Sequence, residues 1–449
     1  MLLLHARWLL PIAEPPIEHG TVAVDGRRIA YVGPRAGAPR GEDHDLGDAL
    51  LMPGLVNAHT HLELTGARGV LDEPSFWSRA RRFAQARAAA LFTDDALLDA
   101  ARLGVAQGLR AGITTYGDSC SSGVALQAMV EAGVRGVMYQ ELVGPAPEQR
   151  ESSLAALRDA IDRLRPLETE LARLGVAPYA VYAVHEDLLI DACVYALGQH
   201  LPIAIHLAEC AAEIEFLREG TGELADALRA LGVPVDRRSH SPVHLLKELA
   251  VSDVARPLLV HGVELDASDV SFIAESGCPV VHCPASNARR GHGIAPVAEL
   301  LAAGVTVGLG TDAVADGERM DVLDQARLAV LLQRARTGRA EAIGAAQALE
   351  LATLGGARAL GLDDRVGSLE VGKDADLAAF PLASSRIAPT HDPVAAAVFA
   401  LAGTPASFVS VAGSVRVDRG ELRGADPDLP ARVQRASEAL LAWARAQGA

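Results

Sequence analysis

Lysine is almost absent from this sequence. Only Lys247 and Lys373 occur among 449 residues, so arginine carries nearly all of the positive charge. The 57 acidic residues outnumber the 41 basic ones and give a net charge of −16. A surface of this sign repels phosphate backbones and anionic lipid headgroups, which argues against nucleic acid or a membrane as partner. We expect a small-molecule ligand, and the composition leaves a homo-oligomer open.

Cysteine pairs and long apolar runs are also missing. The five cysteines contain no CxxC pair, which favours a reducing cytoplasm over a disulfide framework. No apolar run approaches the roughly 18 residues of a membrane helix. The apolar start, MLLLHARWLLPIAEPP, is interrupted by His5 and Arg7 and has no basic segment before it, so we expect a strand there and not a signal peptide. The sequence thus predicts a soluble, cytoplasmic protein.

A glycine-rich phosphate-binding fingerprint is the third absence, and without it a doubly wound open sheet has little support. The middle of the chain instead alternates short apolar runs with Ala/Leu/Arg segments of helical period. Eight such runs can be counted, at 54–61, 112–119, 135–144, 176–186, 201–209, 257–265, 279–286 and 305–314. Eight consecutive strand–helix units predict an α/β fold with a parallel (β/α)8 barrel.

The two ends of the chain differ from this middle part. Residues 1–53 contain short apolar runs punctuated by glycine, and the same pattern returns at 366–425. We expect these two segments to pair into a small β-sandwich domain built from both chain ends, with the barrel at 54–365. The remaining residues, 426–449, have apolar side chains at helical spacing and predict a terminal helix.

Histidines and carboxylates recur where the predicted strands end, and enzymes with this fold carry their active sites at those ends. The residues from strands one, five, six and eight are His59, His61, His206, Glu209, His261 and Asp312. The seventh run adds His282, whose role is more equivocal. The HxH pair alone is a weak signal, but chance placement of the whole set at one end of alternating units is hard to sustain. Imidazole and carboxylate ligands predict zinc, with iron or manganese as alternatives.

Several segments resemble the amidohydrolase superfamily. They are PGLVNAHTHLE, IHLAE, LLVHGVEL, HCPASNARRGHGIAPV, LGTDAV and MDVLDQARLAVLLQR, and VGSLEVGKDADL is similar to the family's returning sandwich strand. More narrowly, they resemble the branch of aminohydrolases and chlorohydrolases acting on aromatic heterocycles, which includes triazine hydrolases and the adenosylhomocysteine/methylthioadenosine and aminodeoxyfutalosine deaminases. The resemblance covers nearly the whole chain and is more specific for the superfamily than for the substrate.

The resemblance implies a metal site with His59, His61, His206 and Asp312 as ligands. Members that bind two metals need a bridging carboxylate, usually a carbamylated lysine on the fourth strand. The fourth predicted strand here, VAPYAVYAVHE, contains no lysine. We therefore expect one divalent metal, zinc before iron or manganese.

The resemblance also implies the catalytic groups Glu209, His261 and Asp312. A divalent metal lowers the pKa of a bound water to roughly 7, which supplies a nucleophile at neutral pH. Asp312 would take the water's proton, Glu209 would protonate the ring nitrogen, and His261 would orient the nucleophile. We expect a hydrolytic deaminase releasing ammonia from an amino-substituted heterocycle, such as a purine nucleoside derivative. Hydrolysis of a C–Cl bond or a cyclic amide is the alternative, and a non-enzymatic binding protein is disfavoured because the ligand set is intact.

Candidate substrate contacts lie near the strand ends and in the loop after the first strand, where an aromatic ring could stack on a heterocycle. They are Glu63, Trp77, Gln140, Tyr179, Tyr182 and Arg290. Two of them depart from the nucleoside deaminases of the branch. Tyr179 stands where their PHAPYT-like stretch has a substrate-contacting histidine, and Arg290 makes the ASNARRGHG loop basic. Both departures favour a different amine, for instance one with a carboxylate, as in aminodeoxyfutalosine.

Overall fold

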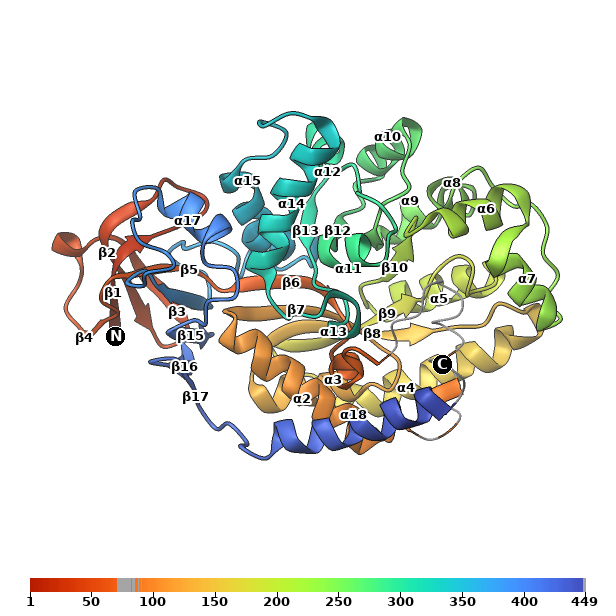
Figure 1. Cartoon of the computed structure of the whole chain (residues 1–449), viewed down its shortest axis with the longest axis horizontal. Helices are drawn as coiled ribbons and strands as arrows, with labels where there is room; N and C mark the ends of the chain where they lie inside the picture. The colour runs from red at the N-terminus through yellow and green to blue at the C-terminus, as the bar shows by residue number, and fades with distance from the viewer. Residues whose placement is uncertain (71–81, 83–84, 88, 90, 447–449) are drawn as a thin grey trace.

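A set of parallel strands runs through the middle of the molecule, with helices above and below it in the view of Figure 1, which shows the computed structural model. The structure describes residues 1–70, 82, 85–87, 89 and 91–446. The parallel strands are β6 (Leu55–Thr60), β7 (Ile113–Cys120), β8 (Arg135–Leu142), β9 (Ala172–Pro178), β10 (Ala204–Leu207), β11 (Leu258–His261), β12 (Val280–His282) and β13 (Val307–Leu309). The predicted α/β class is confirmed.

Helices of one to five turns connect the strands. They include η2 (Leu62–Ala67), α2 (Asp94–Arg110), α3 (Val124–Ala132), α4 (Arg150–Leu164), α5 (Glu186–Gly198), α6 (Ala211–Glu219), α7 (Gly222–Ala230), α8 (Pro242–Glu248), α9 (Val251–Ala255), α10 (Ala267–Ser276), α11 (Pro284–Arg289), α12 (Val297–Ala302), α13 (Val314–Gly317), α14 (Val322–Thr337), α15 (Ala345–Glu350), α16 (Gly356–Ala359) and α17 (Pro393–Phe399). Within the described residues, no helix combines the length and apolarity needed to cross a lipid bilayer.

The parallel strands form two four-stranded sheets, β6–β7–β8–β9 and β10–β11–β12–β13. Parallel bridges from Val176 to Ile203 and from Ala180 to His206 join the edges formed by β9 and β10. At the other edges, the amide of Asp312 donates a hydrogen bond of 3.1 Å to the carbonyl of His59. The backbones of the first and last parallel strands are therefore adjacent.

Each predicted apolar run contains a strand, but several runs extend beyond their strand, as the fourth and the seventh show. The fourth strand, β9, begins and ends earlier than the predicted 176–186. Pro178 has no amide to donate and closes the strand, and the apolar residues beyond it form a buried loop. The seventh, β12, stops at His282 because Pro284 begins α11, where a missing amide costs no helical hydrogen bond.

Both ends of the chain contribute to one nine-stranded sheet. Its strands are β1 (Leu2–Leu9), β2 (Ile17–Asp25), β3 (Arg28–Pro34), β4 (Glu42–Asp45), β5 (Ala49–Pro53), β14 (Leu377–Pro381), β15 (Phe408–Val411), β16 (Ser414–Asp418) and β17 (Glu421–Leu422). The antiparallel pair of β5 with β14 joins the two chain ends, with Leu51 opposite Ala379. The terminal helix α18 (Leu429–Ala446) runs along the lower side of the molecule in Figure 1, where Arg432 bonds Asp99 of α2 at 2.7 Å.

Candidate metal centre

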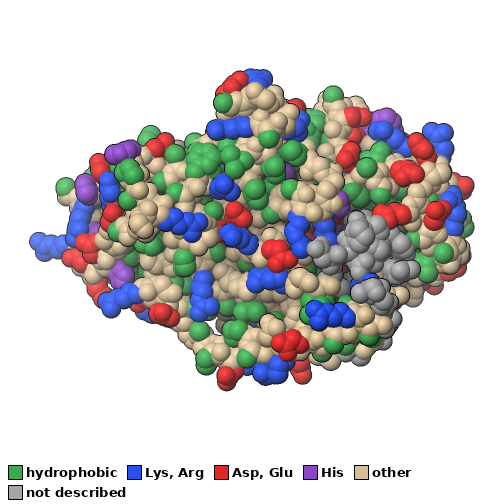
Figure 2. Space-filling view, viewed as in Figure 1, with side chains coloured by type: hydrophobic (Ala, Val, Ile, Leu, Met, Phe, Trp, Pro, Cys, Tyr) green, Lys and Arg blue, Asp and Glu red, His purple; other side chains and the backbone are tan. Residues whose placement is uncertain are grey.

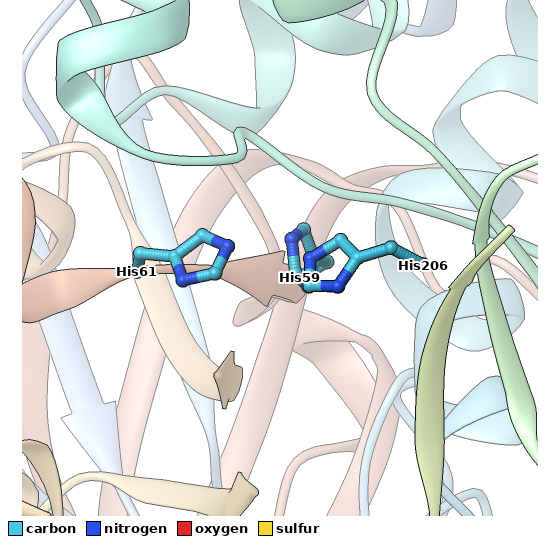
Figure 3. A group of neighbouring side chains, drawn as sticks. All are labelled: His59, His61 and His206. Atoms are coloured by element: carbon cyan, nitrogen blue, oxygen red, sulfur yellow. The ribbon is translucent and has the colours of Figure 1, made fainter. Parts of the chain in front are cut away.

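Three histidines converge where β6 and β10 end. Nitrogen atoms of His59, His61 and His206 lie within 4.8 Å of one another, and all three side chains are buried. His61 and His206 approach from opposite sides with His59 between them (Figure 3). His59 lies within β6, His61 directly follows it, and the i, i+2 spacing puts both on one side of the strand, as predicted.

The donor atoms of this cluster fit a metal ion. The Nε2 atoms of His59 and His206 are buried and, within the described part of the chain, have no hydrogen-bond partner. Burial lowers the pKa of His59 to about 4 and that of His206 well below its ordinary value. Both rings are therefore neutral at physiological pH, and neutral imidazole is the form that binds a metal. Buried nitrogen lone pairs left unused by the protein are what a bound cation would satisfy.

Neighbouring groups orient two of these rings. The Nδ1 of His206 lies 2.8 Å from the carbonyl oxygen of Tyr179. A carbonyl only accepts, so Nδ1 carries the hydrogen and the lone pair of Nε2 faces the cluster. The Nδ1 of His61 lies 3.4 Å from a carboxylate oxygen of Glu141, whose pKa burial raises to about 7. Such outer partners fix the tautomer and the direction of a ligand.

Asp312 brings a carboxylate to the same place. Its Oδ1 lies 3.6 Å from the Nε2 of both His59 and His61. Two ligands bound at roughly 2.1 Å to one tetrahedral ion are about 3.4 Å apart, so the spacing suits a shared ion. Its other oxygen accepts a hydrogen bond of 2.5 Å from Ser286. Burial alone would raise the pKa of Asp312, but the adjacent histidines, His59 first, hold it well below its usual range.

Glu209 and His261 face each other beside the cluster. The Nε2 of His261 is 3.9 Å from an oxygen of Glu209, and the other oxygen of Glu209 is 3.4 Å from Nδ1 of His292. The Nδ1 of His261 lies 3.0 Å from the amide oxygen of Asn287. Because that oxygen accepts, the Nε2 of His261 is left to face Glu209 and the metal cluster. The amide of Glu209 donates to Glu213 at 2.8 Å, and burial raises the pKa of Glu213 to about 8.

The backbone is strained where these side chains leave their strands. Ala208, His261 and Asp312 have φ values of 50°, 79° and 57°. This left-handed region is uncommon for residues other than glycine. It costs on the order of 1–3 kcal/mol per residue and is concentrated at functional sites. The strand ends are thus bent to direct His261 and Asp312 toward one point.

Two predicted substrate contacts, Glu63 and Gln140, lie together around the turn after β7. The carboxylate of Glu63 accepts hydrogen bonds from Cys120 and from the amides and hydroxyls of Ser121 and Ser122. These bonds offset the effect of burial and lower the pKa of Glu63. The amide of Gln140 donates to the carbonyl of Ser121 at 2.9 Å. Glu63 and Gln140 thus hold this turn, and a role in substrate binding stays a prediction.

The other predicted contacts lie in different surroundings. The ring of Tyr179 packs on His206 with centroids 4.7 Å apart, and the ring of Tyr182 lies 6.4 Å from that of Tyr179. Both tyrosines are therefore beside the histidine cluster. Arg290 is nearly buried and its Nε donates to Asp316 at 2.8 Å, so its charge is largely committed within the protein. Trp77 lies outside the described residues.

Sequence reasoning missed the residues that hold the predicted ones in place. Ser286 and Asn287 sit on α11 and bond Asp312 and His261, while Glu213 on α6 bonds the amide of Glu209. All three are buried polar residues in helices that directly follow a parallel strand. That position, in the first turns of a helix after a parallel strand, is the signal that could have found them.

Comparison with known proteins agrees with this geometry. The sequence pattern of the Amidohydrolase family matches residues 50–423. A 5-methylthioadenosine/S-adenosylhomocysteine deaminase of Moorella thermoacetica is 31% identical over 433 residues, covering 94% of this chain and 95% of the relative. A protein of the same name from Halobacterium salinarum is 33% identical over 442 residues, covering 96% and 95%.

Solved structures show the same architecture. An adenosine deaminase from Xanthomonas campestris with bound zinc superposes with a TM-score of 0.85 at 29% identity, covering 98% of both chains. The aminofutalosine deaminase of Helicobacter pylori, at 20% identity and a TM-score of 0.80 over 92% of this chain and all of that one, shows a shared fold. The fold is accordingly an α/β arrangement of the TIM-barrel type. With most of its length matching the family pattern, the chain belongs to the amidohydrolase family.

Proposed function

We propose that this protein is a metal-dependent deaminase that hydrolyses the amino group of a purine nucleoside derivative and releases ammonia. One observation carries the proposal. Ring nitrogens of His59, His61 and His206 and the ionised Asp312 meet at one point, with Glu209 and His261 beside it. Relatives that are named deaminases match this chain over nearly its full length, which supports hydrolysis of a C–N bond other than a peptide bond.

The proposal includes the finer architecture predicted from the sequence. We infer that the eight parallel strands close into a barrel, supported by the bridges between β9 and β10 and by the Asp312–His59 backbone bond. We also infer that the nine-stranded sheet folds over its own core as a sandwich, because a buried cluster joins residues of its two ends, including Leu4 and Phe408. We also propose that the chain is divided into domains at residues 53, 365 and 425, as predicted from the sequence.

One divalent metal, zinc by preference, suits the ligand set. His59, His61, His206 and Asp312 would hold it, and the zinc in the Xanthomonas relative supports that choice. A second metal would need a bridging ligand, and neither lysine is placed to supply one. Lys247 lies over the ring of Phe272 at 4.6 Å, and Lys373 bonds Ser368.

The protein's own residues supply the proton transfers. When bound, a divalent metal lowers the pKa of a coordinated water and so supplies a nucleophile at neutral pH. Asp312, held ionised, accepts the proton of that water. Glu209 carries a proton to the ring nitrogen beside the amino-bearing carbon, so that negative charge does not accumulate in the ring. His261, fixed through its Nδ1 by Asn287, presents Nε2 to orient the nucleophile.

Two substrate types follow from two observations. The names of the relatives favour methylthioadenosine and adenosylhomocysteine. Tyr179, packed on His206 where nucleoside deaminases of this branch have a histidine, favours a different amine such as aminodeoxyfutalosine. No observation of this kind favours the C–Cl or cyclic-amide alternative.

An ammonia-release screen tests the activity. The zinc-loaded protein is incubated with methylthioadenosine, adenosylhomocysteine, adenosine, aminodeoxyfutalosine, pterins and triazines. Chloride and carboxylate products are measured alongside ammonia. We expect ammonia from at least one purine nucleoside derivative. Chloride or carboxylate products without ammonia would refute the deaminase proposal.

Glu209→Gln tests the proton-transfer role on the substrate so found. We expect kcat to fall by roughly 100- to 10,000-fold, the usual size of a general acid–base contribution, with the metal retained. Glu275→Gln, on the exposed side of α10, is the matched control and should leave kcat unchanged. Undiminished turnover in the Glu209 variant would remove Glu209 from the mechanism.

A further inference from the structure

A groove of about 500 Å³, with none of the three clustered histidines among its lining residues, lies where the nine-stranded sheet meets the barrel. The loop after α13, the C-terminal end of α2 and the loop after α17 line it. Figure 2 shows several Lys and Arg side chains over the middle of this face of the molecule. None of the lining residues is a predicted metal ligand, so a ligand bound in this groove would be independent of the proposed function.

Four arginines from four segments line the groove. They are Arg68, Arg110, Arg319 and Arg386. Many other exposed arginines of this acidic protein are paired with a carboxylate, as Arg358 is with Glu350 at 2.8 Å. In the groove, Arg110 and Arg319 have no side-chain partner among the described residues. Arg386 donates to a carbonyl oxygen, that of Ala402, at 2.6 Å.

The two carboxylates of the groove are already engaged. Glu318 lies 3.1 Å from Arg289 and 3.8 Å from Arg68, which draws it away from the other arginines. Asp321 accepts three backbone amides, one of them from Gly403 at 2.6 Å. Guanidinium groups that lie close together without a carboxylate partner favour the binding of an anion.

Gly403 leaves the central space open. A Cβ atom on Gly403 would lie 3.5 Å from Nη1 of Arg319 and 3.8 Å from Nη2 of Arg386. Both guanidinium groups therefore lie on the same side of Gly403. A phosphate or carboxylate group lying between the two guanidinium groups could accept hydrogen bonds from both.

We propose that this groove binds a small oxyanion, a phosphate or carboxylate group carried by a small molecule, between Arg319 and Arg386. A nucleic acid does not fit the proposal, because the net charge of −16 repels an extended polyanion. Since the four arginines come from four segments, the anion would tie the sheet domain to the barrel. It would therefore stabilise the folded protein by mass action.

Calorimetric titration of the zinc-loaded protein at constant ionic strength tests the site, with inorganic phosphate in one arm and succinate in the other. We expect one saturable site for at least one anion, and the anion that binds identifies the ligand as phosphorylated or carboxylic. In Arg319→Gln/Arg386→Gln the Kd should rise at least about tenfold, as expected for lost charge-assisted hydrogen bonds. Arg339→Gln, which removes an exposed arginine paired with Glu341, is the control and should bind like the wild type.

Arg319→Gln alone repeats the test in case the double variant is unstable, because the Arg319 side chain has no hydrogen-bond partner among the described residues. It should also weaken binding. Absence of saturable binding of either anion by the wild type would overturn the proposal. Equal affinity in the wild type and the arginine variants would overturn it too, because the anion would then be bound elsewhere, for example at the metal.

Discussion

The two ends of the parallel strands satisfy their buried polar groups in opposite ways. At the amino end of β8, the guanidinium of buried Arg135 donates to Asp376 at 2.9 Å and to Asp374 at 2.8 Å. At the carboxyl ends of β6 and β10, buried nitrogens of His59 and His206 have no partner within the described residues. At the amino end the buried charges pair within the chain and hold the nine-stranded sheet, whereas the two imidazole nitrogens at the carboxyl ends are free to bind an ion.

The backbone of the two ends differs in which residues take the left-handed conformation. Before β7 and β8 the left-handed conformation is taken by Gly112 and Gly133, for which it costs little. After β10, β11 and β13 it is taken by Ala208, His261 and Asp312. His200 and Arg256 also take it before β10 and β11, so strained residues occur at both ends. At the carboxyl ends the strained residues include His261 and Asp312, whose side chains must point inward.

Removing one ligand should have the largest effect. In His206→Ala we expect metal content to fall far below one ion per chain and kcat/KM to fall at least about 1,000-fold, because Lewis-acid chemistry contributes several kcal/mol. Elemental analysis and ammonia release check this. His240→Ala, at an exposed histidine, is the control and should keep both. A His206 variant with full metal content would contradict the assignment of the ligand.

Breaking the buried pair at the opposite end should affect stability and not the metal. Arg135→Met leaves Asp376 buried without its cation, whereas Asp374 keeps Arg365 and Arg28. Removing the cation of a buried pair typically costs about 3–5 kcal/mol. Urea unfolding should show this loss while the metal content stays at one per folded chain. Arg358→Met, at an exposed pair, should cost less than about 1 kcal/mol. Equal losses in the two variants would show that the buried network contributes little.

The orientation of His261 can be weakened without touching a ligand. Asn287→Ala removes the acceptor of its Nδ1 hydrogen, and loss of such an outer partner typically costs 10- to 100-fold in activity. We expect the loss in kcat, with metal content unchanged and an altered pH profile. Asn287→Asp, which keeps an acceptor, should recover part of the activity. A variant with normal kcat would mean that His261 is held by packing alone.

The sequence could place the candidate ligands together because their positions follow from strand direction and alternation, whereas their role as metal ligands came from the family resemblance and stays a prediction. His59, His61, His206 and Asp312 needed only the statement that eight parallel strands end at one side of the fold. The overlong fourth strand shows the limit of this reasoning. Apolar residues occur both in strands and in buried loops, so an apolar run alone does not show where a strand ends. Pro178 ends β9, although the predicted run continues past it.

Long-range partners could not be predicted from the sequence. Arg290 appeared to make its loop basic, but Asp316, 26 residues away, pairs with it in the fold. Glu63 appeared ready for a substrate, whereas a turn 58 residues further on supplies its hydrogen bonds. Sequence patterns give the type and the face of a side chain, and they do not give its distance from a partner on another element.

The smallest effect concerns His282, a buried histidine at the metal end whose two ring nitrogens have no partner among the described residues. Burial lowers its pKa from 6.5 to about 3. Below pH 6.5 the unfolded chain binds a proton that the folded chain does not bind until about pH 3, so stability falls as the pH falls through this window. Between pH 7 and pH 5 the contribution is about 2 kcal/mol, and urea unfolding of the wild type and His282→Leu at both pH values isolates it. The variant should lose less stability over that interval than the wild type. An equal loss would mean that protonated His282 is stabilised in the fold. The unpartnered ring nitrogens of His282 would then not be evidence that it must stay neutral.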